Sequence, residues 1–480
     1  MPTPPEILAV ERPKNTIVYV YGKNKDKYAV KQRIGCKYKE GRRLPVTGKT
    51  IGHIIDGKYV PKDQPESNER VSNAHVDLKD WANITLCDNL LKPLLEELKK
   101  VYAPEDALKI YCISILRVCN PGIKDYELKD AYETSFLSEL YPNVGLCKNT
   151  VSRFLNDLGK AYSKIVEFMV NRSKNIGIDH HLLIDGTLKS NESSVNSLSD
   201  FSRKAVTKGS RDISVLFAFD LEEGELICSK CFPGNMLDLT AYETFISETG
   251  IHKGIIVGDK GFPESAARAY FKNNPDLHYL NPIKRNSKTI AQNNLFSYDG
   301  ILDGHDNVLF KKVKCPDSDK WLYSFRDSRR AAAEEQDWLK RTKKNGNYNQ
   351  ETLKKKQNTF GTIVLESDMD LSPEQAYKTF ESRWEIEVVI RFYKSACHFD
   401  ETRVHDDYSV IASEFCDFIS SVLTFRLINT FDSLKLLHKY TYKKIMSMLV
   451  RAKKVFIDGS WKLIKLTKSN SDLLTVLGLI

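Results

Sequence analysis

The sequence lacks the features of a secreted or membrane-spanning protein. It contains no apolar run of 18 residues, and the opening segment MPTPPEILAVERPKN does not resemble a signal peptide. The ten cysteines form no regular framework, which excludes a disulfide-rich scaffold and favours a reducing cytoplasm. One tight pair, Cys228 and Cys231, has neither a second pair nor a nearby histidine, so we expect no structural zinc there.

Charge of one sign is only in moderate excess. The formal net charge of +9 gives little reason by itself to expect a polyanionic partner. Basic residues instead gather in three stretches that also contain Tyr or Trp, namely 23–43, 326–356 and 435–468. Each stretch fits either a surface that follows phosphates and stacks on bases or an ordinary solvated loop or helix face.

A chain of 480 residues with 41% hydrophobic residues is too long for one core and predicts a globular, multidomain protein. Short strand-like segments indicate a small β-containing module at residues 1–75. Apolar residues at spacings of three and four then predict a helical domain at 76–176, which we interpret as DNA-binding, and a helical, basic region at 406–480.

Within the helical domain, GLCKNTVSRFLNDLGKAYSKI predicts a turn followed by a helix with a polar start. Such a helix fits the major groove of DNA, with Arg153 near its N-terminus meeting a base edge or a phosphate. A plain bundle helix with a polar first turn is the alternative.

The centre of the chain predicts an α/β core in two parts, at 177–283 and 362–405. HLLID, ISVLFAFD, ELICSKCF and GIIVGD are strand-like, and MLDLTAYETFISETG between the last two is helical. This order suits a mixed sheet. Turn signals around FSYDGILDGHDNVLF predict a mostly β insertion at 284–361, in which Trp321, Tyr323 and Phe325 either stack on bases or pack in a core.

Three carboxylates stand out in this core. Asp185 and Asp259 each follow an apolar strand, and the helical run AYKTFESRWEIEVVIRFYKSA contains the third, Glu387. At 100° per residue, Arg383 and Lys394 lie within roughly 40° of Glu387 on that helix. The alternative is structural: an ion-pair ladder along a helix, and strand-end aspartates that cap turns.

At these positions the sequence resembles the DDE transposases of bacterial insertion sequences, in particular the group with a Tyr-x2-Arg-x3-Glu-x6-Lys signature. The matching segments are Asp185-Gly186-Thr187, Asp259-Lys260-Gly261-Phe262 and the run from Phe380 through Arg383 and Glu387 to Lys394. Phe380 departs from the pattern, because the family usually has Tyr there. The missing hydroxyl puts one phosphate contact in doubt.

The resemblance implies a ribonuclease H-like core and a catalytic triad of Asp185, Asp259 and Glu387 that binds Mg²⁺ or Mn²⁺, with two ions expected. Carboxylates suit such hard ions, and a pair of ions can activate an attacking oxygen and stabilise a leaving one. Phe380, Arg383, Lys394, Arg153 and Trp321 are the candidate DNA-binding residues.

The expected function is that of a transposase that binds the terminal inverted repeats of its element, cuts the strands and transfers them to new DNA. Its partners are double-stranded DNA and further copies of itself, as a homodimer or larger complex, without a membrane, and its expected location is the bacterial cytoplasm near the nucleoid. Two alternatives are a retired transposase that only binds DNA and a ribonuclease H-type nuclease that only cleaves.

Overall fold

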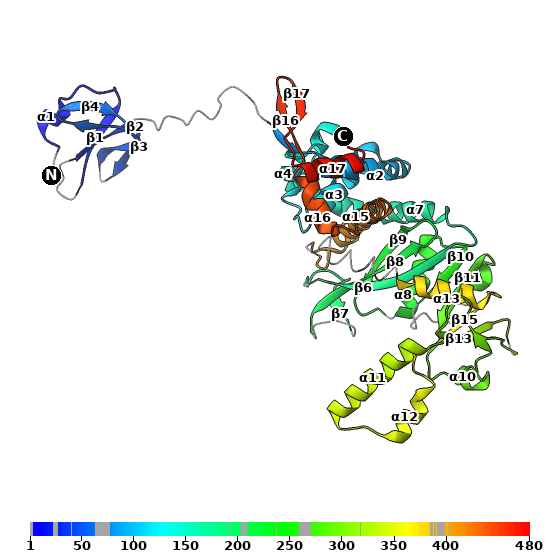
Figure 1. The fold of residues 1–480 in the computed structure, drawn as a ribbon. Coiled ribbons are helices and arrows are strands. Elements are labelled where there is room, and N and C mark those ends of the chain that lie inside the picture. Colours follow the sequence, from blue (N-terminus) through cyan, green and yellow to red (C-terminus); the bar gives the residue numbers. More distant parts are fainter. Residues whose placement is uncertain are drawn as a thin grey trace. The chain divides into compact units, whose positions relative to one another are not determined.

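The structure is a computed structural model that describes residues 3–22, 27–39, 41–62, 77–191, 193–202, 209–236, 238–258, 270–316, 318–384, 387, 390, 399–402 and 404–480. The chain divides into two compact units, Met1–Val76 and Asp77–Ile480, and each is considered by itself (Figure 1). The finer divisions at 176, 283, 361 and 405 stay predictions.

The first unit is a four-stranded antiparallel sheet with the strand order β1-β2-β3-β4. A short helix, α1 (Pro5–Leu8), precedes the strands β1 (Thr16–Tyr21), β2 (Lys27–Lys39), β3 (Arg42–Ile55) and β4 (Lys58–Pro61). Its small core consists of Val18, Val30 and Ile54, with partly buried neighbours.

The second unit is built on a mixed sheet of ten strands, ordered β12-β13-β14-β15-β11-β10-β6-β8-β7, with β9 paired to β8. Its first strands are β6 (His181–Ser190), β7 (Asp200–Phe201), β8 (Arg211–Asp220), β9 (Glu225–Pro233), β10 (Gly254–Val257) and β11 (Leu277–Pro282), with α8 (Asp238–Thr249) between β9 and β10. Strands β6, β8 and β9 are antiparallel, whereas β10 and β11 run parallel to β6. The mixed α/β fold predicted from the apolar segments is confirmed, and the order suits a ribonuclease H-like core.

The predicted insertion continues the same sheet. Its strands are β12 (Gly300–Ile301), β13 (Val308–Lys314) and β14 (Trp321–Asp327), and β14 pairs with β15 (Thr362–Ser367). β15 in turn pairs antiparallel with β11, where Leu280 lies opposite Ser367. The described part of this stretch also forms the helices α10 (Lys288–Gln292), α11 (Ser328–Asn345) and α12 (Gln350–Gln357), which cover more residues than its strands. The prediction of a mostly β insertion is therefore wrong, because the turn signals indicated the hairpin but not the long polar helices that follow it.

Helices from both ends of this unit pack together beside β9 (Figure 1). They are α2 (Ala82–Lys99), α3 (Pro104–Cys119), α4 (Leu128–Glu133), α5 (Leu137–Leu140), α6 (Lys148–Lys160), α7 (Tyr162–Ser173), α15 (Asp407–Ser433), α16 (Tyr442–Val450) and α17 (Lys468–Val476). The strands β5 (Leu78–Asp80), β16 (Lys453–Ile457) and β17 (Ser460–Leu463) form a separate small sheet. Helix α15 is buried around most of its circumference, as expected for a helix inside a core, and one hydrophobic cluster joins these helices to the ten-stranded sheet.

Candidate active site

Asp185 lies in the middle of β6, between β8 and β10 in the sheet. It is partly buried, and its backbone pairs with Phe217 of β8. The amide N–H of Gly186 donates a hydrogen bond to Asp185 Oδ1 at 2.8 Å. The strand forms because the preceding residues Leu182, Leu183 and Ile184 are all buried, so the core fixes the backbone that positions this carboxylate.

The end of β10 lies beside this part of β6. Val257, the last residue of β10, pairs with Leu183, and the N–H of the following residue, Gly258, donates to Asn281 Oδ1 at 3.1 Å. Because β6 and β10 are parallel, their carboxyl ends point toward the same edge of the sheet. Asp259, the second predicted catalytic residue, lies outside the described residues.

Asn281 on β11 was missed by the sequence reasoning. Its side chain is 4% exposed, and while Oδ1 holds the Gly258 amide, its Nδ2 has no hydrogen-bond partner among the described residues. A buried amide donor without a partner is costly, so it stands out beside a candidate site. The signal in the sequence was a polar residue in the otherwise apolar segment LHYLNPI.

The third carboxylate follows α13 (Pro373–Ser382) along the chain. Trp384, Glu387 and Ile390 are helical, and Arg383 Nη2 lies 3.1 Å from Glu387 Oε1, with 21% and 33% of the two side chains exposed. The Arg383 guanidinium also lies 5.9 Å from the centre of the Phe380 ring. The Arg383–Glu387 ion pair that the structural alternative predicts is therefore present. Lys394 lies outside the described residues.

Two contacts anchor the chain on either side of Glu387 to opposite ends of β6. Before Glu387, Thr379 Oγ1 lies 3.3 Å from Nε2 of His181, the first residue of β6. After Glu387, Glu401 forms a parallel bridge with Ser190, the last residue of β6. The chain from Thr379 to Glu401 thus begins at one end of β6 and finishes at the other.

A buried charge network lies next to the far end of β6. Lys189 is 1% exposed, and its Nζ lies 2.5 Å from Glu414 and 2.8 Å from Asp417 on α15. Arg117 of α3 adds a second cation 2.7 Å from Asp417. Burial alone would lower the pKa of Lys189, but Asp417 and Glu414 outweigh it and raise that pKa above its ordinary value. This network ties β6 to the helices.

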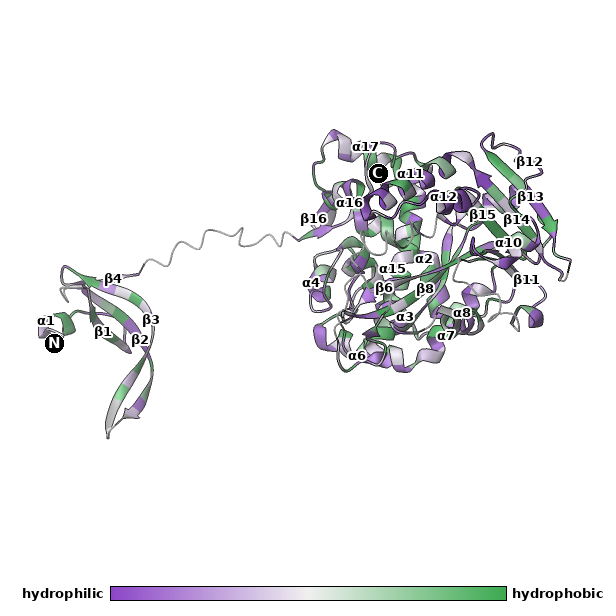
Figure 2. Cartoon of the chain, turned by 90° about the horizontal axis from the view of Figure 1, so that it is seen from below, coloured by the Kyte–Doolittle hydropathy of each residue, from purple (hydrophilic) through white to green (hydrophobic). Residues whose placement is uncertain are grey.

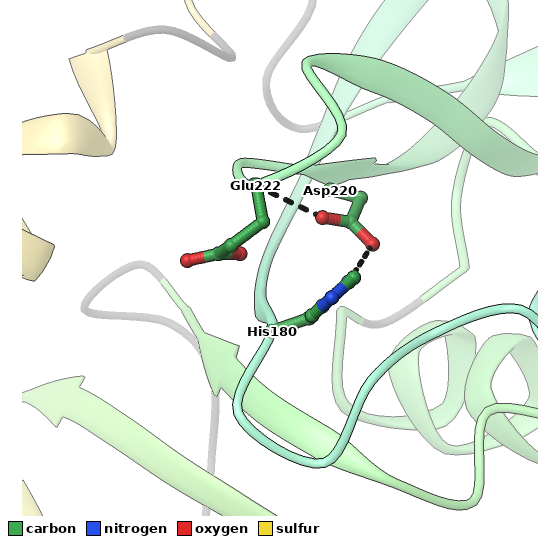
Figure 3. Close-up of side chains that lie close together, drawn as sticks. All are labelled: His180, Asp220 and Glu222. Atoms are coloured by element: carbon green, nitrogen blue, oxygen red, sulfur yellow. Dashed lines mark hydrogen bonds and ion pairs between the residues drawn. The ribbon is translucent and has the colours of Figure 1, made fainter.

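His180, Asp220 and Glu222 form a compact cluster at the opposite end of β6 (Figure 3). Their potential ligand atoms lie within 4.8 Å of one another, but both oxygens of Asp220 already have hydrogen-bond partners within the protein. Its Oδ2 lies 2.7 Å from His180 Nδ1, and its Oδ1 accepts the amide N–H groups of Glu222 and Glu223. The imidazole nitrogen suits Mg²⁺ poorly. We interpret this cluster as a structural tie that closes the β8–β9 turn.

Arg153 lies on the exposed side of α6. Its Nε donates to the carbonyl oxygen of Asn149 at 3.2 Å. The opposite face of α6 is buried, and Gly159 there lies so close to α15 that a Cβ would meet the carbonyl oxygen of Tyr408 at 1.9 Å. The helix therefore packs as a bundle helix through one face while its polar start stays accessible.

The aromatic residues of β14 divide into two groups. Tyr323 and Phe325 are 0% and 1% exposed and belong to a hydrophobic cluster, so core packing is the correct alternative for both. Trp321 is only partly buried. Its ring lies 4.5 Å from the ammonium of Lys312 and 5.8 Å from that of Lys314.

Comparison with known proteins points to one class. The family model described as the transposase DDE domain matches residues 178–410, a range that includes β6, β10 and the Glu387 segment. This match supports a DDE transposase domain in that part of the chain, for which divalent metal ions are the usual cofactor. No curated protein matches the sequence.

Solved structures give a weaker likeness. One is a piggyBac transposase synaptic complex with hairpin DNA, determined by cryo-electron microscopy, at 12% sequence identity and a TM-score of 0.40, covering 79% of this chain and 82% of that one. At this TM-score the likeness is too distant to define the fold. None of the helices in the described parts of the chain has the length and apolarity that a membrane span requires.

Proposed function

We propose that this protein is a transposase that cuts and joins DNA with Asp185, Asp259 and Glu387. The observation that carries the proposal is the anchoring of the Glu387 segment to both ends of the strand that carries Asp185. Together with the DDE domain match over residues 178–410, it favours catalysis over a solvent-facing ion-pair ladder.

The spacing along the two elements supports this arrangement. Glu387 follows Thr379 by eight residues, a rise of about 12 Å in a helix. Asp185 follows His181 by four residues, a rise of about 13 Å in a strand. Since Thr379 contacts His181, a helix running along β6 would bring both carboxylates to the same level. Asp259 directly follows Gly258, whose neighbour Val257 pairs with Leu183, two residues before Asp185.

The available donor set fits hard divalent cations. Asp185 and Glu387 are partly exposed carboxylates, the oxygen ligands that Mg²⁺ and Mn²⁺ prefer. Two such ions, when bound, would activate the attacking oxygen and stabilise the leaving 3′ oxygen. The Arg383–Glu387 ion pair would have to break before the Glu387 carboxylate could bind an ion.

The basic side chains of the same segment would hold the DNA. Arg383 offers a planar fork that matches a phosphate, and Lys394 offers a point charge. Phe380 lacks the hydroxyl of the family's tyrosine but keeps a ring beside Arg383, so it would orient the guanidinium rather than touch a phosphate. Arg153 and Trp321 would contribute contacts farther along the duplex.

In its finer form, the proposal is a bacterial insertion-sequence transposase that binds the terminal inverted repeats of its own element. It would act as a homodimer or larger assembly, because cutting and joining two element ends requires both ends in one complex.

The testing experiment is cleavage and strand joining of a labelled duplex taken from the DNA that flanks the gene, with Mg²⁺ or Mn²⁺. We expect metal-dependent nicking followed by joining, both abolished in Asp185→Asn. Nicking without joining would indicate a nuclease instead. Specific binding without any cutting would indicate a retired transposase that only binds DNA.

A further inference from the structure

One hairpin of the first unit is strongly basic. Residues 31–50 contain one acidic residue and seven basic ones, a net charge of +6, whereas the whole chain carries +9. The basic residues are Lys31, Arg33, Lys37, Lys39, Arg42, Arg43 and Lys49. Like charges this dense repel one another within the folded unit, so the concentration needs a reason other than folding.

The hairpin extends beyond the rest of its sheet. β1 pairs with β2 only between Lys27 and Gln32, and β4 pairs with β3 only between Gly52 and Ile55. Farther out, beyond Arg33 and Thr47, the described parts of β2 and β3 pair only with each other. Figure 2 shows the two strands continuing as a ribbon past β1. We refer to residues 33–47 as the β2–β3 ribbon.

The geometry of the ribbon is fixed by its backbone. Lys39 pairs with Arg42 near the tip. Gly41, which lies between them in the sequence, has φ of +76°, a conformation that favours glycine. Register shifts between Val30 and Gly35 mark bulges, which bend a strand and increase its twist. The ribbon is therefore a regular two-stranded hairpin that extends beyond the rest of its sheet.

Nothing in the described part of the unit covers this ribbon. The core residues Val18, Val30 and Ile54 all lie at its base. On the ribbon itself, Tyr38 is 75% exposed and Ile34 64%. Unpaired strand edges with exposed apolar side chains are a liability unless a partner or charge protects them.

We propose that the β2–β3 ribbon docks in the major groove of double-stranded DNA. The major groove admits a two-stranded ribbon, and six rises from Arg33 to Lys39 give a length of about 20 Å. The basic side chains would neutralise phosphates on both walls of the groove, and Tyr38 and Ile34 offer apolar contacts to base edges. The ribbon belongs to the first compact unit and Asp185 to the second. The inference rests on the proposed function, because it names one surface by which a DNA-cutting protein would hold its duplex.

The test measures binding of the full chain to a labelled duplex with metal chelated, so that the outcome does not depend on catalysis. The variant is Arg33→Gln/Lys37→Gln/Lys49→Gln, which removes three exposed charges on or beside the ribbon. The matched control is Lys14→Gln/Lys58→Gln/Lys62→Gln, which removes three exposed charges elsewhere in the same unit. Binding is titrated between about 50 and 200 mM salt, where phosphate contacts dominate the change in affinity.

We expect the ribbon variant to bind at least about tenfold more weakly at low salt and its salt slope to fall by about 2.7, because each phosphate that is no longer neutralised reduces the slope by about 0.9. The control should change affinity less than about threefold. Equal weakening of both variants would overturn the proposal in favour of net charge alone, and unchanged binding in the ribbon variant would also overturn it. A change in oligomeric state with unchanged DNA binding would identify the ribbon as an interface between copies instead.

Discussion

Charged groups at the two ends of β6 are buried, whereas those near its middle are partly exposed. At the ends, Asp220 and Lys189 are almost completely buried, and each is held by several partners. In the middle, Asp185 is only partly buried, and Glu387 keeps 33% of its side chain exposed beside one ion pair. A buried charge survives only when it is fully paired, so the ends of the strand serve stability. The accessible carboxylates are placed to exchange their partners, as the proposed chemistry requires.

The sharpest test of this difference is Glu387→Gln. We expect cutting to fall by about 10²- to 10³-fold, the loss typical when one group that stabilises the transition state is removed, because the amide is a poor ligand for a divalent ion. The melting temperature should stay the same, since the ion pair it removes is partly exposed. Cleavage assays and thermal unfolding measure the two effects.

The matched control is Glu381→Gln, an exposed glutamate six residues earlier in the same segment, which should cut normally. If Glu387→Gln cut as well as the control, the ion-pair ladder would be the correct interpretation.

At the far end of β6, Lys189→Met is expected to reduce stability and to leave cutting unchanged. Removing the cation leaves two buried carboxylates without it and should lower the free energy of unfolding by about 3 to 5 kcal/mol. The molecules that remain folded should keep their metal-dependent cutting. Denaturant titration measures the decrease in stability.

Lys99→Met provides the comparison, because its ion pair with Glu96 is exposed and should be worth less than about 1 kcal/mol. Similar decreases from Lys99→Met and Lys189→Met would show that burial does not set the difference between the two lysines.

The smallest effect is expected at the first end, where the hydrogen bond to Asp220 raises the pKa of His180 against the opposing effect of burial. A pKa raised in the folded state means that the stabilisation is complete below the unfolded value, about 6.5, and is lost as the pH rises through the folded value. The free energy of unfolding should therefore decrease in that window. His180→Gln should flatten this dependence; an unchanged pH profile would contradict the assignment.

Short sequence patterns were sufficient to predict the strands and helices of the core, because buried segments are rich in apolar residues. HLLID and GIIVGD became β6 and β10, and the two apolar segments between them became the β8–β9 hairpin and its turn. The candidate carboxylates were found for the same reason, since each follows or faces a buried segment.

Contacts between residues far apart in the sequence could not be predicted, because no local hydrophobic pattern indicates them. The pairing of β11 with β15 joins Leu280 to Ser367, and it merges the predicted insertion with the core sheet. The counterions of Lys189 lie more than 200 residues away in the sequence, on α15. The role of Asn281 likewise depends on β10, because the residue after that strand, Gly258, donates its N–H to the Asn281 side chain.

The position of α15 has a consequence for folding during synthesis on the ribosome. This helix, residues 407–433, fills the centre of a core whose other walls come from α2, α3, α6 and β9. A chain growing from its N-terminus must therefore keep those apolar surfaces uncovered until most of the sequence has been synthesised. An interrupted translation product that lacks α15 would leave this core open, so the second unit can close its core only after residue 433 has been synthesised.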